Sequence, residues 1–233
     1  MDFIKKFFKK ILSSLGFEII IKAKNLNQEK YTTVASVGNI VACQIEAYFL
    51  VLNKFLNNDD KVLDVGFGLG YGINTLSIKA SKIWGIEVDA KAYDYCQNTL
   101  VGRNPKLQKL LIYDGYHIDF PDEYFDIVTC VDVIEHVEDY EKLIIEMLRV
   151  CRMGVFISTP NRRPEYTNKD GTSKNYWHLR EWNFEEFNKI IEKFGKIEWN
   201  FLNGPFDGPF TITNVIEKNT LTLTPFIYKK RKL

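Results

Sequence analysis

The sequence predicts an α/β fold in which a doubly wound, mostly parallel sheet carries helices on both faces. Between residues 61 and 161, short apolar runs alternate with segments whose apolar residues recur at the spacing of a helix. Such alternation builds parallel sheets, because each helix crosses a face of the sheet to reach the next strand. The first apolar run ends in a series of glycines, and a strand that ends this way lets its backbone pass close to a ligand.

The segment Lys61–Gly72 predicts a buried strand, a glycine-rich turn and a helix that begins near Tyr71. Open α/β sheets bind ligands beyond the carboxyl ends of their strands, so a nucleotide-type cofactor is expected at this turn. The spacing does not fit a dinucleotide fingerprint, because Tyr71 or Ile73 stands where the third glycine belongs. It does not fit a P-loop either, because Gly72 is followed by Ile73 and Asn74 rather than by Lys and Ser or Thr.

Four further strands are expected in chain order, with a helical pattern in each interval. The strands are predicted at residues 81–89, 110–114, 125–130 and 154–161. The clearest helix covers Tyr140–Cys151, where apolar residues recur three or four positions apart. A helix over residues 39–55 is expected before the first strand, and another near residues 184–194 with Asn183 as its N-cap.

The pattern Asp64-x-Gly66-x-Gly68-x-Gly70 resembles the first motif of class I S-adenosylmethionine-dependent methyltransferases of the type 11/23-like group. The second strand supports the resemblance, because it ends in an acid, Glu87, about 20 residues further along the chain. The resemblance covers roughly residues 61–161. It implies a Rossmann-like sheet of strand order 3-2-1-4-5-7-6 with an antiparallel last strand. One departure is Phe67, which stands where the family often has a small residue or Cys, partly facing the methionine end of the cofactor.

The resemblance implies S-adenosylmethionine as the cofactor and assigns its contacts. Glu87 is expected to accept hydrogen bonds from the ribose hydroxyls, while Asp89 caps the following helix. Asp114 stands in the place where the family holds the adenine amino group. The other expected cofactor-binding residues are Asp64, Gly66, Gly68, Gly70, Val88, Gly115 and Asp132.

Methyl transfer from a sulfonium requires the acceptor to be held in line with the methyl group. An oxygen acceptor of high pKa also needs a base or a metal to remove its proton. His136 and His178 are the candidate catalytic residues, as a base or as a contact to the acceptor. The alternative for His178 is a structural hydrogen bond within its own loop.

A possible metal motif follows the fourth strand. Asp132, Glu135 and His136 resemble the acid-x-x-Glu-His motif of two methyltransferase groups that use a divalent ion. These groups are the ubiquinone-pathway O-methyltransferases and the small-RNA 3′-end 2′-O-methyltransferases. They carry Glu where this chain carries Asp132, and many relatives without a metal have a similar stretch. We therefore expect no metal and keep the three residues as the alternative ligand set.

Residues 160–182 are polar and rich in breakers, and they follow a central strand on the ligand side of the sheet. A loop of this length is usually functional or disordered, and the aromatic and charged cluster at its end argues against disorder. We predict that it forms an acceptor-site insertion. Arg162 and Arg163 either bind a phosphate or carboxylate of the acceptor or form a solvated pair. Residues 203–210 form either a second wall of the site or a stiff turn.

The 233 residues suit one α/β domain, with a helical appendage expected at residues 1–57 and the methyltransferase domain at residues 58–233. The net charge of +1 gives no electrostatic case for nucleic-acid binding. The four cysteines form no C-x-x-C pair, and no signal peptide or membrane-spanning run is found, which favours the cytoplasm. The amphipathic residues 3–15 either pack on the domain or a second copy, or contact the inner membrane surface with help from the basic tail 229–232.

The leading interpretation is an S-adenosylmethionine-dependent methyltransferase that O-methylates a small-molecule or glycan-linked acceptor. The run Glu29-Lys30-Tyr31, together with the Gly-Tyr-Gly loop, loosely resembles bacterial methyltransferases associated with surface-glycan pathways. Two alternatives stay open. One is a nicotinamide-dependent oxidoreductase on a similar fold, and the other is a protein that binds S-adenosylmethionine without catalysis.

Overall fold

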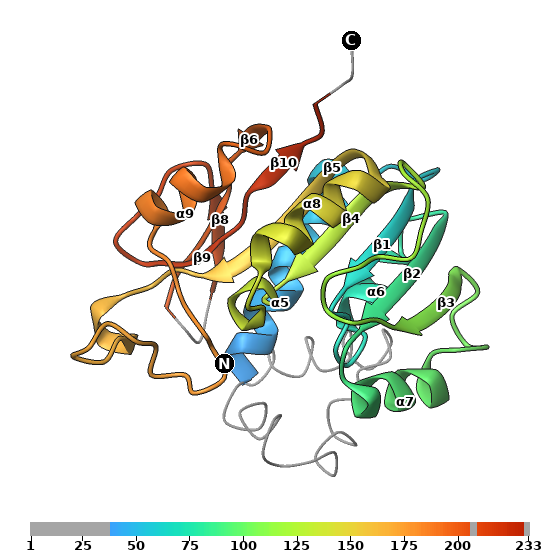
Figure 1. Ribbon diagram of the computed structural model, residues 1–233, viewed down its shortest axis with the longest axis horizontal. Helices are drawn as coiled ribbons and strands as arrows, with labels where there is room; N and C mark the ends of the chain where they lie inside the picture. The colour runs from blue at the N-terminus through green and yellow to red at the C-terminus, as the bar shows by residue number, and fades with distance from the viewer. Residues whose placement is uncertain (1–37, 206–208, 231–233) are drawn as a thin grey trace.

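In the computed structural model, which describes residues 38–205 and 209–230, ten strands form one mixed sheet (Figure 1). One half of this sheet is parallel, in the order β3-β2-β1-β4-β5. Its strands are β1 (Lys61–Val65), β2 (Lys82–Glu87), β3 (Leu107–Ile112), β4 (Phe125–Val131) and β5 (Cys151–Pro160). The first part of the predicted strand order is therefore confirmed.

The other half of the sheet is antiparallel and consists of shorter strands. These are β6 (Lys196–Glu198), β7 (Phe201–Asn203), β8 (Thr211–Thr213), β9 (Thr220–Leu223) and β10 (Phe226–Tyr228). Strands β10 and β9 pair with two successive parts of β5 and together take the place of the predicted seventh strand. Strand β6 pairs with β10 and β7 pairs with β9, so these two short strands take the place of the predicted sixth strand. Strand β8 pairs with β7 at the edge of the sheet. The predicted order 3-2-1-4-5-7-6 is confirmed, with each of the last two strands interrupted once.

The two interruptions are joined to each other by hydrogen bonds. The N–H of Asn200 donates to the carbonyl of Thr224 at 3.3 Å, and the N–H of Thr224 donates to the carbonyl of Asn200 at 3.0 Å. The hydroxyl of Thr224 donates to the same carbonyl at 2.6 Å. Because Pro225 comes next and has no N–H, the ladder cannot run through this point without a break.

Helices cover both faces of the sheet. They are α5 (Gly38–Leu50) with its π-helical continuation η2 (Val51–Phe55), α6 (Tyr71–Leu76), α7 (Ala90–Thr99), α8 (Tyr140–Val150) and α9 (Phe184–Ile191). Helices α5, α6 and α7 share one core cluster with Val62 and Phe156, whereas α8 and α9 share another with Leu63 and Val155. Successive strand residues face opposite sides of a sheet, which separates the two clusters. Figure 1 shows α8 crossing in front of β4 and β5, with α5 behind them.

Two predicted helix starts are confirmed by their N-caps. The side chain of Asp89 accepts hydrogen bonds from the N–H groups of Lys91 (2.7 Å) and Ala92 (3.3 Å) at the start of α7. Asn183 forms a capping box with Glu186 at the start of α9. Such caps satisfy N–H groups that have no partner inside the helix.

Several sequence predictions concern residues outside the described ranges. These include the helix at residues 3–15, the motif Glu29–Tyr31, the end of the basic tail and residues 206–208 of the loop 203–210. The domain boundary at residue 57 stays a prediction, although α5 shares a core cluster with the sheet. In the part of the chain that is described, no helix combines the length and the apolar character needed to cross a membrane.

Candidate functional site

A cavity of about 1110 Å³ lies along the carboxyl ends of the parallel strands. Pockets for one small molecule commonly measure roughly 300–1,000 Å³, so this cavity has room for a cofactor and a second molecule. The expected site residues that line it are Gly66, Gly68, Glu87, Val88, Asp114, Gly115, Asp132, Glu135, His136 and His178. The structure thus brings together most of the residues that the sequence singled out, and it leaves Asp64 and Gly70 behind the cavity wall.

Two glycines of the turn have different roles. Gly68 leaves space for a ligand, whereas Gly70 allows close packing against a neighbouring side chain. Gly68 has a φ of +51°, and the nearest atom to a Cβ placed there would be the carbonyl oxygen of Gly66 at 4.0 Å. A ligand can therefore approach the backbone of Gly68 where a side chain would stand. Gly70 has a φ of +82°, but its missing Cβ would lie 2.5 Å from Cδ1 of Leu100. Gly70 therefore serves packing rather than direct contact with a ligand.

Glu87 ends β2 with its carboxylate fixed by backbone donors. Oε2 accepts a hydrogen bond from the N–H of Gly68 at 2.8 Å. Oε1 accepts from the N–H groups of Val88 (2.9 Å) and Asp89 (3.0 Å). A carboxylate offers about four acceptor positions, so these bonds leave room for a ribose hydroxyl. The residues present fit the ribose of the expected cofactor.

Asp114 follows β3 and is fixed in a similar way. Its Oδ1 accepts hydrogen bonds from the N–H groups of Tyr116 (2.8 Å) and His117 (2.7 Å). These backbone bonds hold the pKa of Asp114 below its usual value. Val88 lies beside Gly115, with its Cγ1 3.7 Å from the position of a Cβ on that glycine. Together these residues form the part of the cavity expected to hold the adenine.

Asp64 is fully buried and does not face the cavity. Its Oδ1 accepts hydrogen bonds from the hydroxyls of Thr129 (2.8 Å) and Tyr48 (3.1 Å). Burial raises the pKa of Asp64 to about 7, and these two hydrogen bonds oppose the rise. The expected direct contact with the cofactor is therefore replaced by an indirect one, because Tyr48 on α5 lines the cavity and Asp64 holds Tyr48. The sequence analysis did not single out Tyr48.

Phe67 lines the cavity and is also packed into the core. The residue is buried, and its ring packs against β2 in the core cluster of α5 and α6. A Cβ on Gly85 would lie 2.6 Å from Cδ1 of Phe67. The aromatic ring at position 67 thus occupies space left by Gly85 while the residue also borders the cavity.

Asp132 stands at the end of β4 in a backbone conformation that non-glycine residues rarely take, with a φ of 51°. Its Oδ1 accepts a hydrogen bond from the hydroxyl of Ser158 at 2.5 Å. Its own N–H donates to the carbonyl and hydroxyl oxygens of Ser158, each at 3.1 Å. Burial raises the pKa of Asp132, while hydrogen bonds from Ser158 and Gln44 lower it. The neighbouring strand β5 therefore holds this carboxyl at the cavity wall.

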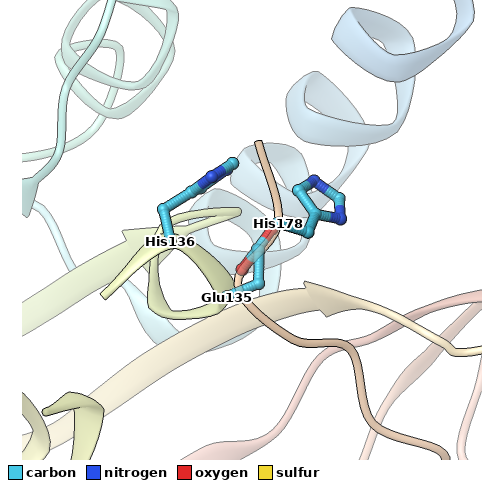
Figure 2. A group of neighbouring side chains, drawn as sticks. All are labelled: Glu135, His136 and His178. Carbon is cyan, nitrogen blue, oxygen red and sulfur yellow. The ribbon is translucent and has the colours of Figure 1, made fainter. Parts of the chain in front are cut away.

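Glu135, His136 and His178 form a compact group in which one ligand atom of each lies within 4.8 Å of the others (Figure 2). Glu135 and His136 come from the short 3₁₀ turn Ile134–His136 after β4, and His178 comes from the loop that follows β5. Oε1 of Glu135 is buried and has no hydrogen-bond partner among the described residues. Burial and the nearby charge of Asp132 raise the pKa of Glu135 well above its usual value.

The surroundings of this group fit a divalent cation. Nδ1 of His136 lies 2.7 Å from the carbonyl oxygen of Trp177, and Nδ1 of His178 lies 2.5 Å from Oε1 of Glu181. Such outer partners orient the other ring nitrogen in metal sites, and two imidazoles with a carboxylate suit a borderline ion. In this structure Nε2 of His178 lies 2.8 Å from Nδ2 of Asn175. A cation here would have to displace that amide.

This group differs from the ligand set considered in the sequence analysis. Asp132 is not part of it and is bonded to Ser158 instead. His178 takes its place, although it is distant in the sequence and reaches the site only through the path of the loop. No local spacing pattern links His178 to Glu135, so the motif alone could not reveal the pairing.

The loop 160–182 contributes a large part of the cavity wall. Arg163 lines the cavity, but Arg162 does not, because its guanidinium is paired with Glu186 on α9. Helix α5 contributes further wall residues that the sequence analysis did not single out, Cys43 and Gln44. Helix α5 is apolar on most sides, so its sequence does not separate positions that face the cavity from positions that face the core.

Comparison with known proteins finds similarity mainly over the parallel half of the sheet. Residues 63–158 match the family model of a methyltransferase domain. A probable S-adenosylmethionine-dependent methyltransferase from Mycolicibacterium smegmatis is 33% identical over 138 residues, which cover 58% of this chain and 51% of that protein. A ubiquinone biosynthesis O-methyltransferase from Nitrosomonas europaea is 30% identical over 112 residues, which cover 46% of this chain and 47% of that protein. The chain spans about half the length of the curated relatives it matches.

Among solved structures, an S-adenosylmethionine-dependent methyltransferase from Thermotoga maritima superimposes with a TM-score of 0.65. The match covers 92% of this chain and 100% of that chain, at 17% identity. At this identity the likeness shows the fold alone, and it agrees with the Rossmann-like architecture described above.

Proposed function

Because residues 63–158 match the family model of a methyltransferase domain, we propose that the chain transfers the methyl group of S-adenosylmethionine to an oxygen atom of a small-molecule or glycan-linked acceptor. The observation that carries this proposal is the position of Glu87. Its carboxylate is held by the N–H of Gly68 and faces the same cavity as Asp132 and His178. Cofactor and acceptor would therefore meet in one space.

The proposed mechanism depends mainly on placement. Methyl transfer is an in-line displacement, so the protein must align the acceptor with the methyl group and exclude water. Glu87 and Asp114 would hold the adenosine part, and Asp132 would border the methionine part. We place His136 and His178 at the acceptor hydroxyl, where they contact it and take up its proton.

A metal would be the alternative to this arrangement, because an imidazole nitrogen that holds a cation cannot also take up a proton. A divalent cation held by Glu135, His136 and His178 would polarise the acceptor oxygen and lower the pKa of its hydroxyl. The proposal of an oxygen acceptor is supported by this polar group and by the relative named as an O-methyltransferase.

The direct test supplies the protein with methyl-labelled S-adenosylmethionine and a bacterial cell extract, with and without a chelator. We expect label in small molecules or in soluble or lipid-linked glycans, and far less label with Glu87→Gln. Asp94→Asn, at an exposed position on α7, is the control for a lost carboxylate outside the cavity. Label confined to RNA or protein would overturn the proposed acceptor class.

Two other functions predict different results. A nicotinamide oxidoreductase would change NADH fluorescence on binding, and we expect no such change because the third glycine of the dinucleotide fingerprint is missing. A protein that only binds the cofactor would show calorimetric binding but would label no acceptor in any fraction.

A further inference from the structure

We propose that Arg163 binds an anionic group of the acceptor, a phosphate or a carboxylate, in the part of the cavity lined by the loop 160–182. The inference rests on the proposed function and adds a substrate class. The acceptor would carry a hydroxyl that is methylated and, elsewhere in the same molecule, a negative charge.

The Arg163 guanidinium is held in place by an aromatic ring. It lies over the ring of Tyr166, with its central carbon 4.9 Å from the ring centroid. The Arg163 carbonyl accepts hydrogen bonds from the hydroxyl of Thr167 (2.8 Å) and the N–H of Tyr166 (3.0 Å), which fix the backbone at the start of this turn. A guanidinium stacked by its face keeps its N–H edges for a planar anion, which it can bind with two parallel hydrogen bonds.

This cation is withdrawn from water without a strong partner. The Arg163 side chain is only 16% exposed, and among the described residues its ion-pair partner is Glu165, at 3.3 Å between Nη1 and Oε1. The side chain of Glu165 is itself 55% exposed. Exposed carboxylates contribute little to an ion pair, whereas a half-buried charge is costly unless it is well paired. An anion from a ligand would supply the missing partner.

Arg163 lines the same cavity as His136 and His178, where the acceptor hydroxyl is proposed to lie. Cys43 is a buried residue of α5 in the cavity wall, and the charges of Asp132 and Arg163 both affect the pKa of its thiol. Burial and, to a smaller extent, the carboxylates of Asp132 and Glu46 raise the pKa of the Cys43 thiol to about 12, whereas Arg163 opposes the rise. Asp132, Arg163 and Cys43 thus line one cavity, and both charges act on the same thiol.

A second cation supports the assignment, and a neighbouring one provides its control. Lys174 lines the same cavity, and its Nζ donates to the carbonyl of Glu165 at 2.9 Å, beside Arg163. Arg162 has a different environment, because it is paired with Glu186 and donates to the carbonyl of Glu181 at 3.4 Å. Arg162 therefore serves as a control with the same charge, because it does not line this cavity.

The test measures anion binding to protein saturated with S-adenosylhomocysteine, the demethylated cofactor. Inorganic phosphate and, in a parallel series, acetate are titrated at constant ionic strength while tryptophan fluorescence is followed, because Trp177 lines the cavity. We expect saturable binding of at least one anion, with the stronger one identifying the acceptor group. The dissociation constant should rise at least tenfold in Arg163→Met and less in Arg163→Lys, and stay unchanged in Arg162→Met.

The outcomes separate this inference from the proposed function. An unchanged dissociation constant in Arg163→Met, or no saturable binding of either anion to the wild type, would overturn the anion site. Failure of S-adenosylhomocysteine to bind would overturn the proposed function, and the anion titration without it would still report on Arg163. Arg163→Lys keeps the positive charge and provides a second reading if Arg163→Met proves unstable in a thermal melt.

Discussion

At the residue scale, Asp64 shows how a position in a motif can serve the site without touching the ligand. The residue is fully buried, and its hydrogen bonds to Tyr48 and Thr129 connect α5 to β4. Gly72 permits this arrangement, because a Cβ there would lie 2.3 Å from both Oδ2 of Asp64 and the ring of Tyr48. The acid thus positions the helix that covers the cavity.

Asp64 should make the stability of the protein depend on pH. Its pKa is about 7 in the folded chain, against about 3.9 in an unfolded one. A raised folded pKa contributes stability that is fully present below about pH 4 and is lost as the pH rises through 7. Asp64→Asn changes the free energy of unfolding relative to wild type. We expect this change to be about 2–4 kcal/mol less destabilising at pH 8 than at pH 4. Urea unfolding at both pH values measures this, and an equal difference at the two would contradict it.

Glu87 should determine cofactor affinity rather than stability. We expect Glu87→Gln to weaken binding of S-adenosylhomocysteine about 10- to 100-fold, because a hydrogen bond to a charged group contributes about 1.5–3 kcal/mol. Isothermal calorimetry measures the affinity, and a thermal melt of the ligand-free variant checks the fold. Unchanged affinity in a folded variant would show that the ribose lies elsewhere.

At the element scale, predictions succeeded where burial leaves a clear pattern in the sequence. Strands β1 and β4 are buried on both faces, so their apolar runs marked them well. Strand β3 begins earlier than predicted, at Leu107, because Gln108 and Lys109 of this edge strand are exposed and give no apolar signal. The pairing of His178 with Glu135 depends on the loop path, which no periodicity encodes.

Helix α8 is joined to the expected adenine loop by a charged network. Arg149 forms two hydrogen bonds of 2.8 Å with Glu146 and donates to the carbonyls of Ile118 (2.7 Å) and Phe120 (2.8 Å). Glu146 also accepts from the N–H of Ile118 at 3.1 Å. The network fixes the segment that follows Asp114, so it supports the cofactor site from outside the cavity.

The same network should stabilise the fold in a pH-dependent way. Hydrogen bonds from Arg149 lower the pKa of Glu146 to about 2, below its value in an unfolded chain. A lowered folded pKa contributes stability above about pH 4.3, and this is lost as the pH falls through 2. We expect Glu146→Gln to lower the free energy of unfolding by about 1–3 kcal/mol at pH 7 and by progressively less below pH 4. Glu141→Gln, which breaks an exposed pair with Lys193, should cost under about 1 kcal/mol in the same unfolding assay.

At the scale of the whole molecule, the cavity is assembled from segments that are far apart in the chain. Helix α5, the turn after β4 and the loop after β5 all contribute walls, and the parallel strands hold them at one edge of the sheet (Figure 1). The group of Glu135, His136 and His178 belongs to two of these segments. An ion bound there would therefore hold the loop 160–182 to the body of the domain.

Metal removal tests this link. We expect Mn²⁺ or Ni²⁺ to raise the melting temperature of chelator-treated protein, because a ligand at about 100 times its dissociation constant stabilises by about 2.7 kcal/mol. His178→Ala should abolish the shift. His117→Ala, an exposed histidine paired with Glu146, should retain it. An equal shift in both variants would place the ion elsewhere.

The contact between Phe67 and Gly85 ties the evolution of two positions together. Since a Cβ on Gly85 would lie 2.6 Å from the Phe67 ring, a relative with a bulky residue at the first position is constrained to keep glycine at the second. Relatives with a small residue at the first position lose the closest of three contacts, while Leu110 and Ile73 would still lie 2.9 and 3.0 Å from that Cβ. Pairwise covariation across an alignment of such chains should therefore link position 85 to positions 67, 73 and 110 together.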